Sequence, residues 1–302
     1  VAMACSAPDV SKGINSLPEL RRAKAGFSLA WKSRASDYFL DIADDGFAIA
    51  SGPQVSEHDV LEVQRACQTG DWHVCVATDC LAECSAPTCS CSRSMNPTCR
   101  ESFLKAVVER VVDAAKFETQ VTYASIGAGL LRFDFSFLEC CLHAGVPVGA
   151  VHLVDNRYDP DTEGHACHRV ALAQFAAWFG DRNIDVFVHP SVEKFAFHAR
   201  KTDVLPVAVL QVDCSELTYL FDTEVKPMLE EVLRYGGLFC ALTAREGAKS
   251  VGLASVGDAW GELWRLQLES GRLKLLSRLR FRANREEPEV YGEDDDLPPA
   301  CC

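Results

Sequence analysis

The feature that most constrains this chain is the alternation of short apolar runs with helical segments between Val121 and Arg282. Apolar residues fill strand-length runs and then recur at helical spacing in the segments between them. The predicted strands are Val121–Ile126, Ala150–Val154, Ile184–Val188, Val207–Val212 and Leu238–Leu242, and the predicted helices are Leu130–His143, His165–Phe179, Val192–Ala199 and Glu216–Arg234. Strands separated by helices pair in parallel through right-handed crossovers. The pattern therefore predicts a doubly wound α/β sheet.

Two further runs predict that this sheet closes in an antiparallel hairpin. Glu262–Leu268 and Lys274–Arg282 flank a Glu-Ser-Gly turn. Tight turns join antiparallel strands, whereas parallel strands need a longer crossover. We therefore expect a mostly parallel sheet of seven strands with the last pair antiparallel.

The remainder of the chain divides into an N-terminal extension, residues 1–100, and an acidic tail, residues 285–302, around a Rossmann-like domain, residues 101–284. In the extension, Tyr38–Ala43 and Phe47–Ala50 read as a hairpin, and Val55–Thr69 reads as a helix. Asn96–Lys116 is an amphipathic helix that leads into the main domain. The tail carries acidic and proline residues, which predict a mobile terminus.

The cysteine content is high, since 15 of the 302 residues are Cys. Seven of them lie between Cys67 and Cys99, in a stretch that reads as a loop. Three interpretations remain open, in this order: tolerance of Cys in place of Ser or Ala, disulfides in an oxidising compartment, and a zinc site. Zinc ranks last because the stretch contains no C-x-x-C pair.

Charge and hydropathy restrict the partners. The net charge of −13 repels phosphate backbones, so bulk nucleic-acid binding is not expected. No apolar run reaches the roughly 18 residues of a membrane span. We expect a soluble protein. The sequence starts at Val1 rather than Met, so cytoplasmic and organellar locations, including a plastid after removal of a transit peptide, both stay open.

Ligands of doubly wound sheets bind outside the carboxyl ends of the strands. The residues at those ends are Ser125–Gly129, Asp155-Asn156, His189–Ser191 and Asp213–Ser215. Gly127 and Gly129 permit a tight turn and a close approach of backbone to ligand. A carboxylate at Asp155 can accept both hydroxyl hydrogens of a ribose, although it can equally cap a helix. We favour the ribose interpretation because the glycines and the acid occur in the expected order.

A nicotinamide dinucleotide competes for this interpretation. Its fingerprint G-x-G-x-x-G requires a third glycine, and Arg132 stands at that position. A reductase would also need a proton donor such as a Tyr-x-x-x-Lys pair, which the segment from Tyr219 does not provide. Both points argue against an NAD-dependent enzyme.

Tyr123–Leu131 resembles the first motif of class I S-adenosylmethionine-dependent methyltransferases. Asp155 matches the acid that these enzymes carry after their second strand, and Lys226–Phe239 resembles their late helix, Gly-Gly and strand segment. The resemblance covers roughly 160 residues. It implies S-adenosylmethionine as cofactor, with Gly127 and Gly129 at its methionine end and Asp155 on its ribose.

The resemblance further implies that Asn156 and the loop His189–Ser191 flank the adenine and that Asp213 lies near the transferred methyl group. Ser125 falls within the cofactor-binding motif, where the family usually carries an acid. Leu131 replaces a frequent third glycine. His189-Pro190 stands where an acid commonly reads the adenine amino group, and Asp213-Cys214-Ser215 replaces the Asn-Pro-Pro-Tyr of amino-group methylators.

Two hypotheses follow from the sequence. In the first, the protein is a methyltransferase with an unidentified small-molecule or protein acceptor, Asp213 is the best-placed base and His189 is the second. In the second, it is a catalytically silent methyltransferase-fold subunit that binds a protein partner through residues 1–100 and the acidic tail, in a larger complex for which an organellar location stays open. Histidine spacing indicates no metal site.

Overall fold

The computed structural model describes residues 39–42, 48–51, 57–69, 81–83, 97–116, 118–159, 161–162, 165–180, 182–211, 224–244, 260–282 and 285–291. Cys75, Cys80, Cys84, Cys89 and Cys91 lie outside these residues, as do Asp213 and the region of 212–223. No helix in the described ranges is both long enough and apolar enough to cross a bilayer.

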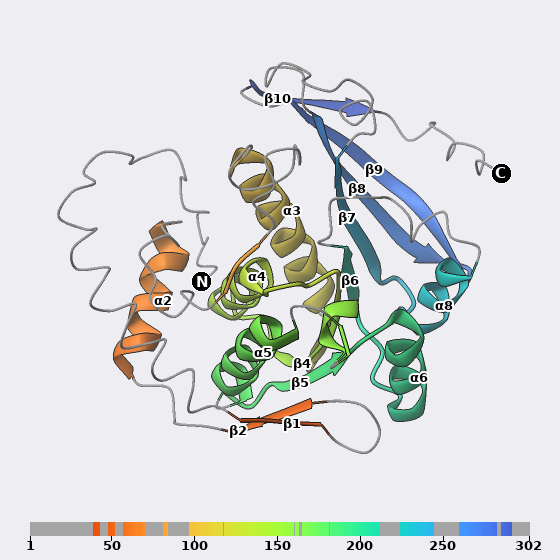
Figure 1. Ribbon diagram of the computed structural model, residues 1–302. Helices are drawn as coiled ribbons and strands as arrows, with labels where there is room; N and C mark the ends of the chain where they lie inside the picture. The colour runs from red at the N-terminus through yellow and green to blue at the C-terminus, as the bar shows by residue number, and fades with distance from the viewer. Residues whose placement is uncertain are drawn as a thin grey trace.

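A single twisted sheet organises the described part of the chain (Figure 1). Its strands lie in the order β10-β9-β8-β7-β6-β3-β4-β5. They are β3 (Val121–Ile126), β4 (Val148–Val154), β5 (Asp185–His189), β6 (Ala208–Gln211), β7 (Leu238–Ala244), β8 (Trp260–Glu269), β9 (Arg272–Arg282) and β10 (Arg285–Tyr291). The five strands from β3 to β7 are parallel, and β8, β9 and β10 add antiparallel neighbours. This confirms the predicted doubly wound sheet with its antiparallel close.

Helices cover both faces of the sheet and form two apolar cores. On one face lie α3 (Pro97–Ala115), α4 (Arg132–His143) and α5 (His165–Gly180), and on the other lie α6 (Val192–Thr202) and α8 (Val225–Val232). Alternate residues of β3 enter different cores: Tyr123 packs with the first layer, whereas Ala124 and Ile126 pack with the second. Strands buried on both faces must be continuously apolar, which explains the runs seen in the sequence.

The predicted extension contributes to the larger core. Helix α2 (Glu57–Thr69) packs against α4 through Val63, and Leu81 is also buried in that core. The hairpin of β1 (Phe39–Ile42) and β2 (Ala48–Ser51) is antiparallel, as predicted, and contacts α5 and β5. Packing therefore continues across residue 100, where the sequence suggested a boundary.

The beginning of the predicted acidic tail, residues 285–291, forms strand β10, which the sequence analysis did not predict. Strand β10 pairs with β9 in a register that sets Glu289 opposite Arg280 and Val290 opposite Leu279. The sequence did not reveal this strand because composition does not show that the segment pairs with β9.

The turn between β3 and α4 carries three left-handed residues. Gly127, Gly129 and Leu131 have φ angles of 69°, 54° and 66°. Leu131 is fully buried and stands at the N-terminal boundary of α4. A side chain in this conformation costs roughly 1–2 kcal/mol, so the apolar contacts of Leu131 offset a strained backbone. The sequence lacks a third glycine here, but the backbone keeps the conformation that a glycine would adopt.

Because of this strain, a glycine should be more stable than an alanine at position 131, the reverse of the order within a helix. The free energy of unfolding of Leu131→Gly should be about 1 kcal/mol higher than that of Leu131→Ala, because glycine adopts positive φ without cost. Urea unfolding measures the difference. Leu138 in the middle of α4 is the control, and there the Ala variant should be the more stable by about 1 kcal/mol. The same order of stability of the Gly and Ala variants at positions 131 and 138 would contradict the strain at Leu131.

Candidate functional site

A pocket of about 270 Å³ opens at the carboxyl ends of β3, β4 and β5. Its size is close to the lower end of small-molecule pockets, roughly 300–1,000 Å³. The described residues that line it are Ile126, Gly127, Val154, Asp155, Asn156, Pro190, Ser191, Val192, Glu193 and Val225. The order of the strands switches sides here, because the chain runs from β3 outward through β4 and β5 and then continues with β6 and β7 on the other side of β3. The pocket therefore lies at the switch point where doubly wound sheets bind ligands.

The glycine turn is hydrogen-bonded to the end of β4. The N–H groups of Gly127 and Ala128 both donate to the carbonyl of Val154, at 2.8 and 3.3 Å. The N–H of Gly129 donates to Oδ2 of Asp155 at 2.9 Å. Three successive backbone donors of the turn are thus directed into the protein. A cradle for phosphate needs such donors to face the ligand, so this turn does not provide one.

Asp155 is both a helix cap and a pocket residue. Its Oδ1 accepts a hydrogen bond of 2.9 Å from the N–H of Arg157, which caps the short 3₁₀ helix η3 (Asn156–Tyr158). Its Oδ2 accepts the bond from Gly129. An ionised carboxylate offers about four acceptor positions, so two remain for a ligand. The two backbone bonds fix the orientation of the carboxylate.

Tyr158 forms a further contact with the glycine turn. It is buried, and its hydroxyl donates a hydrogen bond of 2.8 Å to the carbonyl of Gly129. Gly129 is therefore held through both its N–H and its carbonyl by residues that follow β4. This arrangement makes the turn and the end of β4 one rigid unit.

A short segment of the N-terminal region also contacts the turn. The N–H of Ala82 donates to the carbonyl of Leu130 at 3.1 Å, and the N–H of Arg132 donates to the carbonyl of Ala82 at 3.3 Å. Glu83 lies 3.8 Å from the buried guanidinium of Arg100 on α3. The segment thus joins the glycine turn to the helix layer, a link that sequence patterns did not reveal because the partners are far apart along the chain.

Ser125 faces the helix layer rather than the pocket. Its side chain is fully buried. Burial raises the pKa of Asp134 in the first turn of α4 to about 7, and the Ser125 hydroxyl and the charge of Arg100 oppose that rise. The carboxyl group that the resemblance expects at position 125 is absent, but Asp134 brings a carboxyl close to the Ser125 hydroxyl.

His189 does not reach the pocket either. Its ring is buried against α6, and its Nε2 lies 3.0 Å from Nδ1 of His152 on β4. His198 of α6 completes a cluster in which the ring centroids of the three histidines are 5.3–5.6 Å apart. The structure therefore speaks against His189 as a base for a pocket ligand, since the strand alternation turns its side chain into the core.

Two histidines of the cluster, His152 and His189, are neutral at physiological pH. Burial, with a smaller contribution from the neighbouring His198, lowers the pKa of His189 to about 3. Burial and the charges of His189 and His198 also hold the pKa of His152 well below its usual value. In the described part of the chain, no three or more His, Cys, Asp or Glu side chains are arranged to hold a metal ion.

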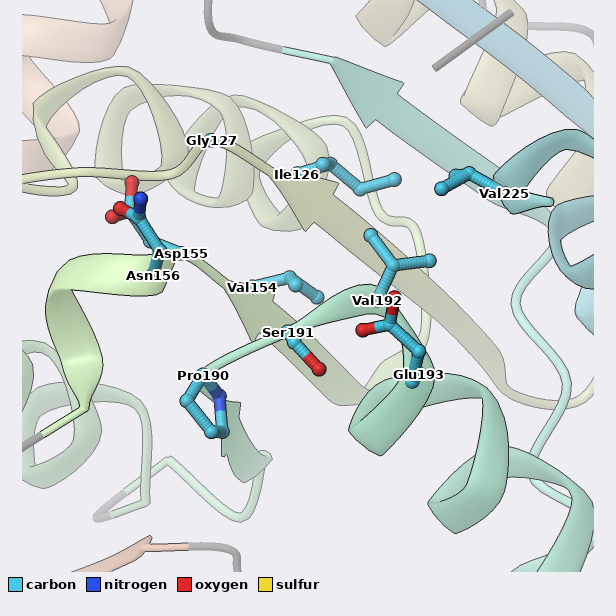
Figure 2. A pocket seen from close by; sticks show the side chains of 10 residues that line it. All are labelled: Ile126, Gly127, Val154, Asp155, Asn156, Pro190, Ser191, Val192, Glu193 and Val225. Atoms are coloured by element: carbon cyan, nitrogen blue, oxygen red, sulfur yellow. The ribbon is translucent and has the colours of Figure 1, made fainter. Parts of the chain in front are cut away.

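Of the residues predicted for the site, Gly127, Asp155 and Asn156 line the pocket, and Gly129 lies directly behind Asp155. Figure 2 shows Asp155 and Asn156 on one side of the pocket and Glu193 on the other. Asp213 lies outside the described residues. Glu193 was not predicted, because an acid in the first turn of a helix is an ordinary helix-start pattern and gives no separate signal for a ligand.

No family model and no curated protein sequence matches this chain. Solved structures resemble it at low similarity. One from Plasmodium falciparum, assigned as a protein-L-isoaspartate O-methyltransferase and bound to S-adenosyl-L-homocysteine, is 12% identical with a TM-score of 0.39, over 86% of this chain and 93% of that one. A cyclopropane synthase from Mycobacterium tuberculosis is 13% identical with a TM-score of 0.32, over 50% and 48%.

A third, an S-adenosylmethionine-dependent methyltransferase from Clostridium acetobutylicum, is 11% identical with a TM-score of 0.31, over 64% of this chain and 71% of that one. At TM-scores below 0.5, these matches transfer no activity, ligand or residue role. Only the residues of the site itself can indicate a function here.

The buried histidines predict a loss of stability in acid. A histidine whose pKa is lowered on folding takes up a proton on unfolding, so its stabilising contribution is complete above about pH 6.5 and declines as the pH falls toward 3. His189→Gln removes this pH-dependent contribution to the free energy of unfolding. The stability advantage of the wild type over His189→Gln should shrink by about 1.4 kcal/mol per pH unit between pH 6 and pH 4.

Urea unfolding at a series of pH values measures this difference. His143→Gln is the matched control, because His143 is exposed at the end of α4. Its pH profile should run parallel to that of the wild type. A parallel profile for His189→Gln as well would show that His189 is not titrating from a buried, neutral state.

Proposed function

We propose that this protein is an S-adenosylmethionine-dependent methyltransferase whose cofactor binds in the pocket over Gly127 and Asp155. The observation that carries the proposal is the Asp155 carboxylate. It is held by two backbone N–H bonds at the end of β4, lines the pocket, and keeps acceptor positions for a ligand. The acceptor of the methyl group is not specified by the residues of the site.

The first support is the fit of Asp155 to a ribose. Two neighbouring hydroxyl groups need two acceptors with fixed directions, and one oriented carboxylate supplies them. Gly127 lines the pocket next to it at a φ of 69°, where a side chain would both strain the backbone and narrow the approach. Both features suit a nucleoside placed against the turn.

The second support is the absence of a phosphate site in the described residues. The N–H groups of Gly127, Ala128 and Gly129 bond within the protein. The charged residues lining the pocket are Asp155 and Glu193, both acidic. S-adenosylmethionine carries a nucleoside, a sulfonium, an ammonium and a carboxylate group. Its net charge is positive and it has no phosphate, so it matches this pocket better than a dinucleotide does.

The third support is an apolar wall. Ile126, Val154, Val192 and Val225 also line the pocket and are labelled in Figure 2. A purine ring buries apolar surface against such side chains, which contributes roughly 25 cal/mol per Å² removed from water. Apolar side chains beside the Asp155 carboxylate correspond to the mixed polarity of an adenosine.

When bound, the cofactor supplies a methyl group on a sulfonium, which can pass to a nucleophile of the acceptor. The residues of this chain bind and orient: Asp155 holds the ribose, Gly127 and Gly129 shape the floor, and Asn156 lies at the adenine side. Asp213 follows β6 in the chain, and we retain it as the proton acceptor, should the acceptor carry a proton. Ser125 is buried and does not line the pocket, so its effect on the cofactor is indirect, through the packing beneath the glycine turn.

A silent subunit is the second candidate, and one observation favours it. Among the described pocket residues, the titratable side chains are Asp155 and Glu193, and our proposal uses Asp155 for ribose binding and assigns no proton transfer to either. The two candidates are separated by cofactor binding followed by methyl transfer to a panel of acceptors.

Titration calorimetry with S-adenosylmethionine tests the proposal. The wild type should bind at micromolar concentration, and Asp155→Ala should weaken binding at least tenfold, because loss of hydrogen bonds to a charged group costs roughly 1.5–3 kcal/mol. Asp155→Asn, which keeps one acceptor oxygen, should lie between them. Asp159→Asn is the control, since Asp159 stands at the other end of the short helix η3 that Asp155 caps but does not line the pocket.

Absence of binding to the wild type at millimolar cofactor would refute the proposal. Equal binding by the wild type and Asp155→Ala would refute the placement of the ribose. Thermal unfolding of each variant, recorded in parallel, shows whether loss of the cap on η3 disturbs the fold.

A further inference from the structure

Helix α6 begins at the rim of the pocket. Ser191 caps it, accepting a hydrogen bond of 3.3 Å from the N–H of Lys194. Ser191, Val192 and Glu193 all line the pocket, so the N-terminal end of an 11-residue helix opens directly on the ligand space. Figure 2 shows this end of the helix facing the side of the pocket opposite Asp155.

A free helix N-terminus attracts anions. Its first N–H groups have no partner within the helix, and the helix dipole adds the equivalent of about half a positive charge. Phosphate groups bind at such ends in many proteins. If no acid were present, this end of the pocket would therefore favour phosphorylated ligands.

Glu193 places a full negative charge in that first turn. Its side chain is exposed and lines the pocket, and no hydrogen bond or ion pair to another described residue occupies its carboxylate. One negative charge exceeds the roughly half positive charge of the helix end. The nearby Lys226 lies 4.0 Å from Glu230, and neither Lys226 nor Lys194 is among the lining residues.

The pocket is small, so a ligand anywhere within it interacts electrostatically with the charge of Glu193. A sphere of 270 Å³ is about 8 Å across, no larger than the Debye length of ~8 Å at physiological salt. Asp155 adds a second negative charge on the other side. The pocket is therefore a small volume between two carboxylates, with no cation among its described lining residues.

We propose that Glu193 sets the charge selectivity of this pocket, so that it takes nucleosides carrying a positive charge and rejects phosphorylated ones. The inference rests on the proposed cofactor and extends it to the product. In methyl transfer the carbon–sulfur bond breaks, its electron pair stays on sulfur, and the acceptor's electron pair forms the new bond to the methyl group. The bound ligand thereby loses one positive charge and becomes S-adenosylhomocysteine, a neutral thioether at that centre.

Glu193 should accordingly favour the cofactor relative to the product and oppose the binding of nucleotides. Its exposure to water limits the size of the effect. For charges about 6 Å apart, we expect a change in relative affinity of about three- to tenfold when the charge is removed.

The experiment measures four affinities by calorimetry: S-adenosylmethionine, S-adenosylhomocysteine, adenosine and adenosine 5′-monophosphate. The proteins are the wild type, Glu193→Gln, Glu193→Asp and Asp185→Asn. Asp185→Asn changes the net charge equally at the start of β5, the strand end away from the pocket. Glu193→Gln should lower the preference for cofactor over product and the preference for adenosine over its monophosphate, each three- to tenfold, while adenosine itself binds as before.

Glu193→Asp, which keeps the charge, and Asp185→Asn should both retain the wild-type ratios. Unchanged ratios in Glu193→Gln, with cofactor binding intact in the wild type, would overturn the role of Glu193 and leave the proposed function standing. Equal weakening of all four probes in Glu193→Gln would indicate packing rather than charge and would also overturn it. Failure of the wild type to bind either the cofactor or adenosine would overturn the proposed function together with this inference.

Discussion

The attachment of the glycine turn to the end of β4 is the constraint on which the site depends. Gly127, Ala128 and Gly129 donate their N–H groups to Val154 and Asp155, and Tyr158 binds the carbonyl of Gly129. These bonds satisfy backbone groups that would otherwise be buried without partners, which is costly. They also decide what the site can bind, because donors that are bonded within the protein are not available to a phosphate. Structural stability and ligand class thus follow from the same set of hydrogen bonds.

Sequence periodicity predicted the sheet well because its central strands are buried on both faces. The strand Val121–Ile126 matches β3 residue for residue, and the hairpin at β8 and β9 was visible from its turn. The place of Gly127 and Asp155 at the pocket was also predictable, since both follow strand ends, where ligands of such sheets bind. These predictions depend on local pattern and on the general rules of parallel sheets.

Features that depend on distant parts of the chain were not predictable. The contact of Ala82 with Leu130 and Arg132, and the cluster of His152, His189 and His198, join segments that no local pattern connects. His189 appeared at a strand end, but the side-chain alternation of β5 turns it into the core. Leu131 shows the converse case: the sequence departs from glycine, yet packing holds a leucine at a φ of 66°. Residue identity alone does not reveal when burial compensates for strain.

The central claim is that Asp155 and the glycine turn together form a nucleoside site. A crystal structure of the protein grown with S-adenosylmethionine tests it most directly. Our interpretation predicts the ribose hydroxyls within hydrogen-bond distance of the Asp155 carboxylate, with the bond from Gly129 N–H to Asp155 retained and the adenine against the valine side chains of the pocket. Ligand density at another place, or a pocket without ligand while both Asp155 oxygens keep their backbone bonds, would contradict it.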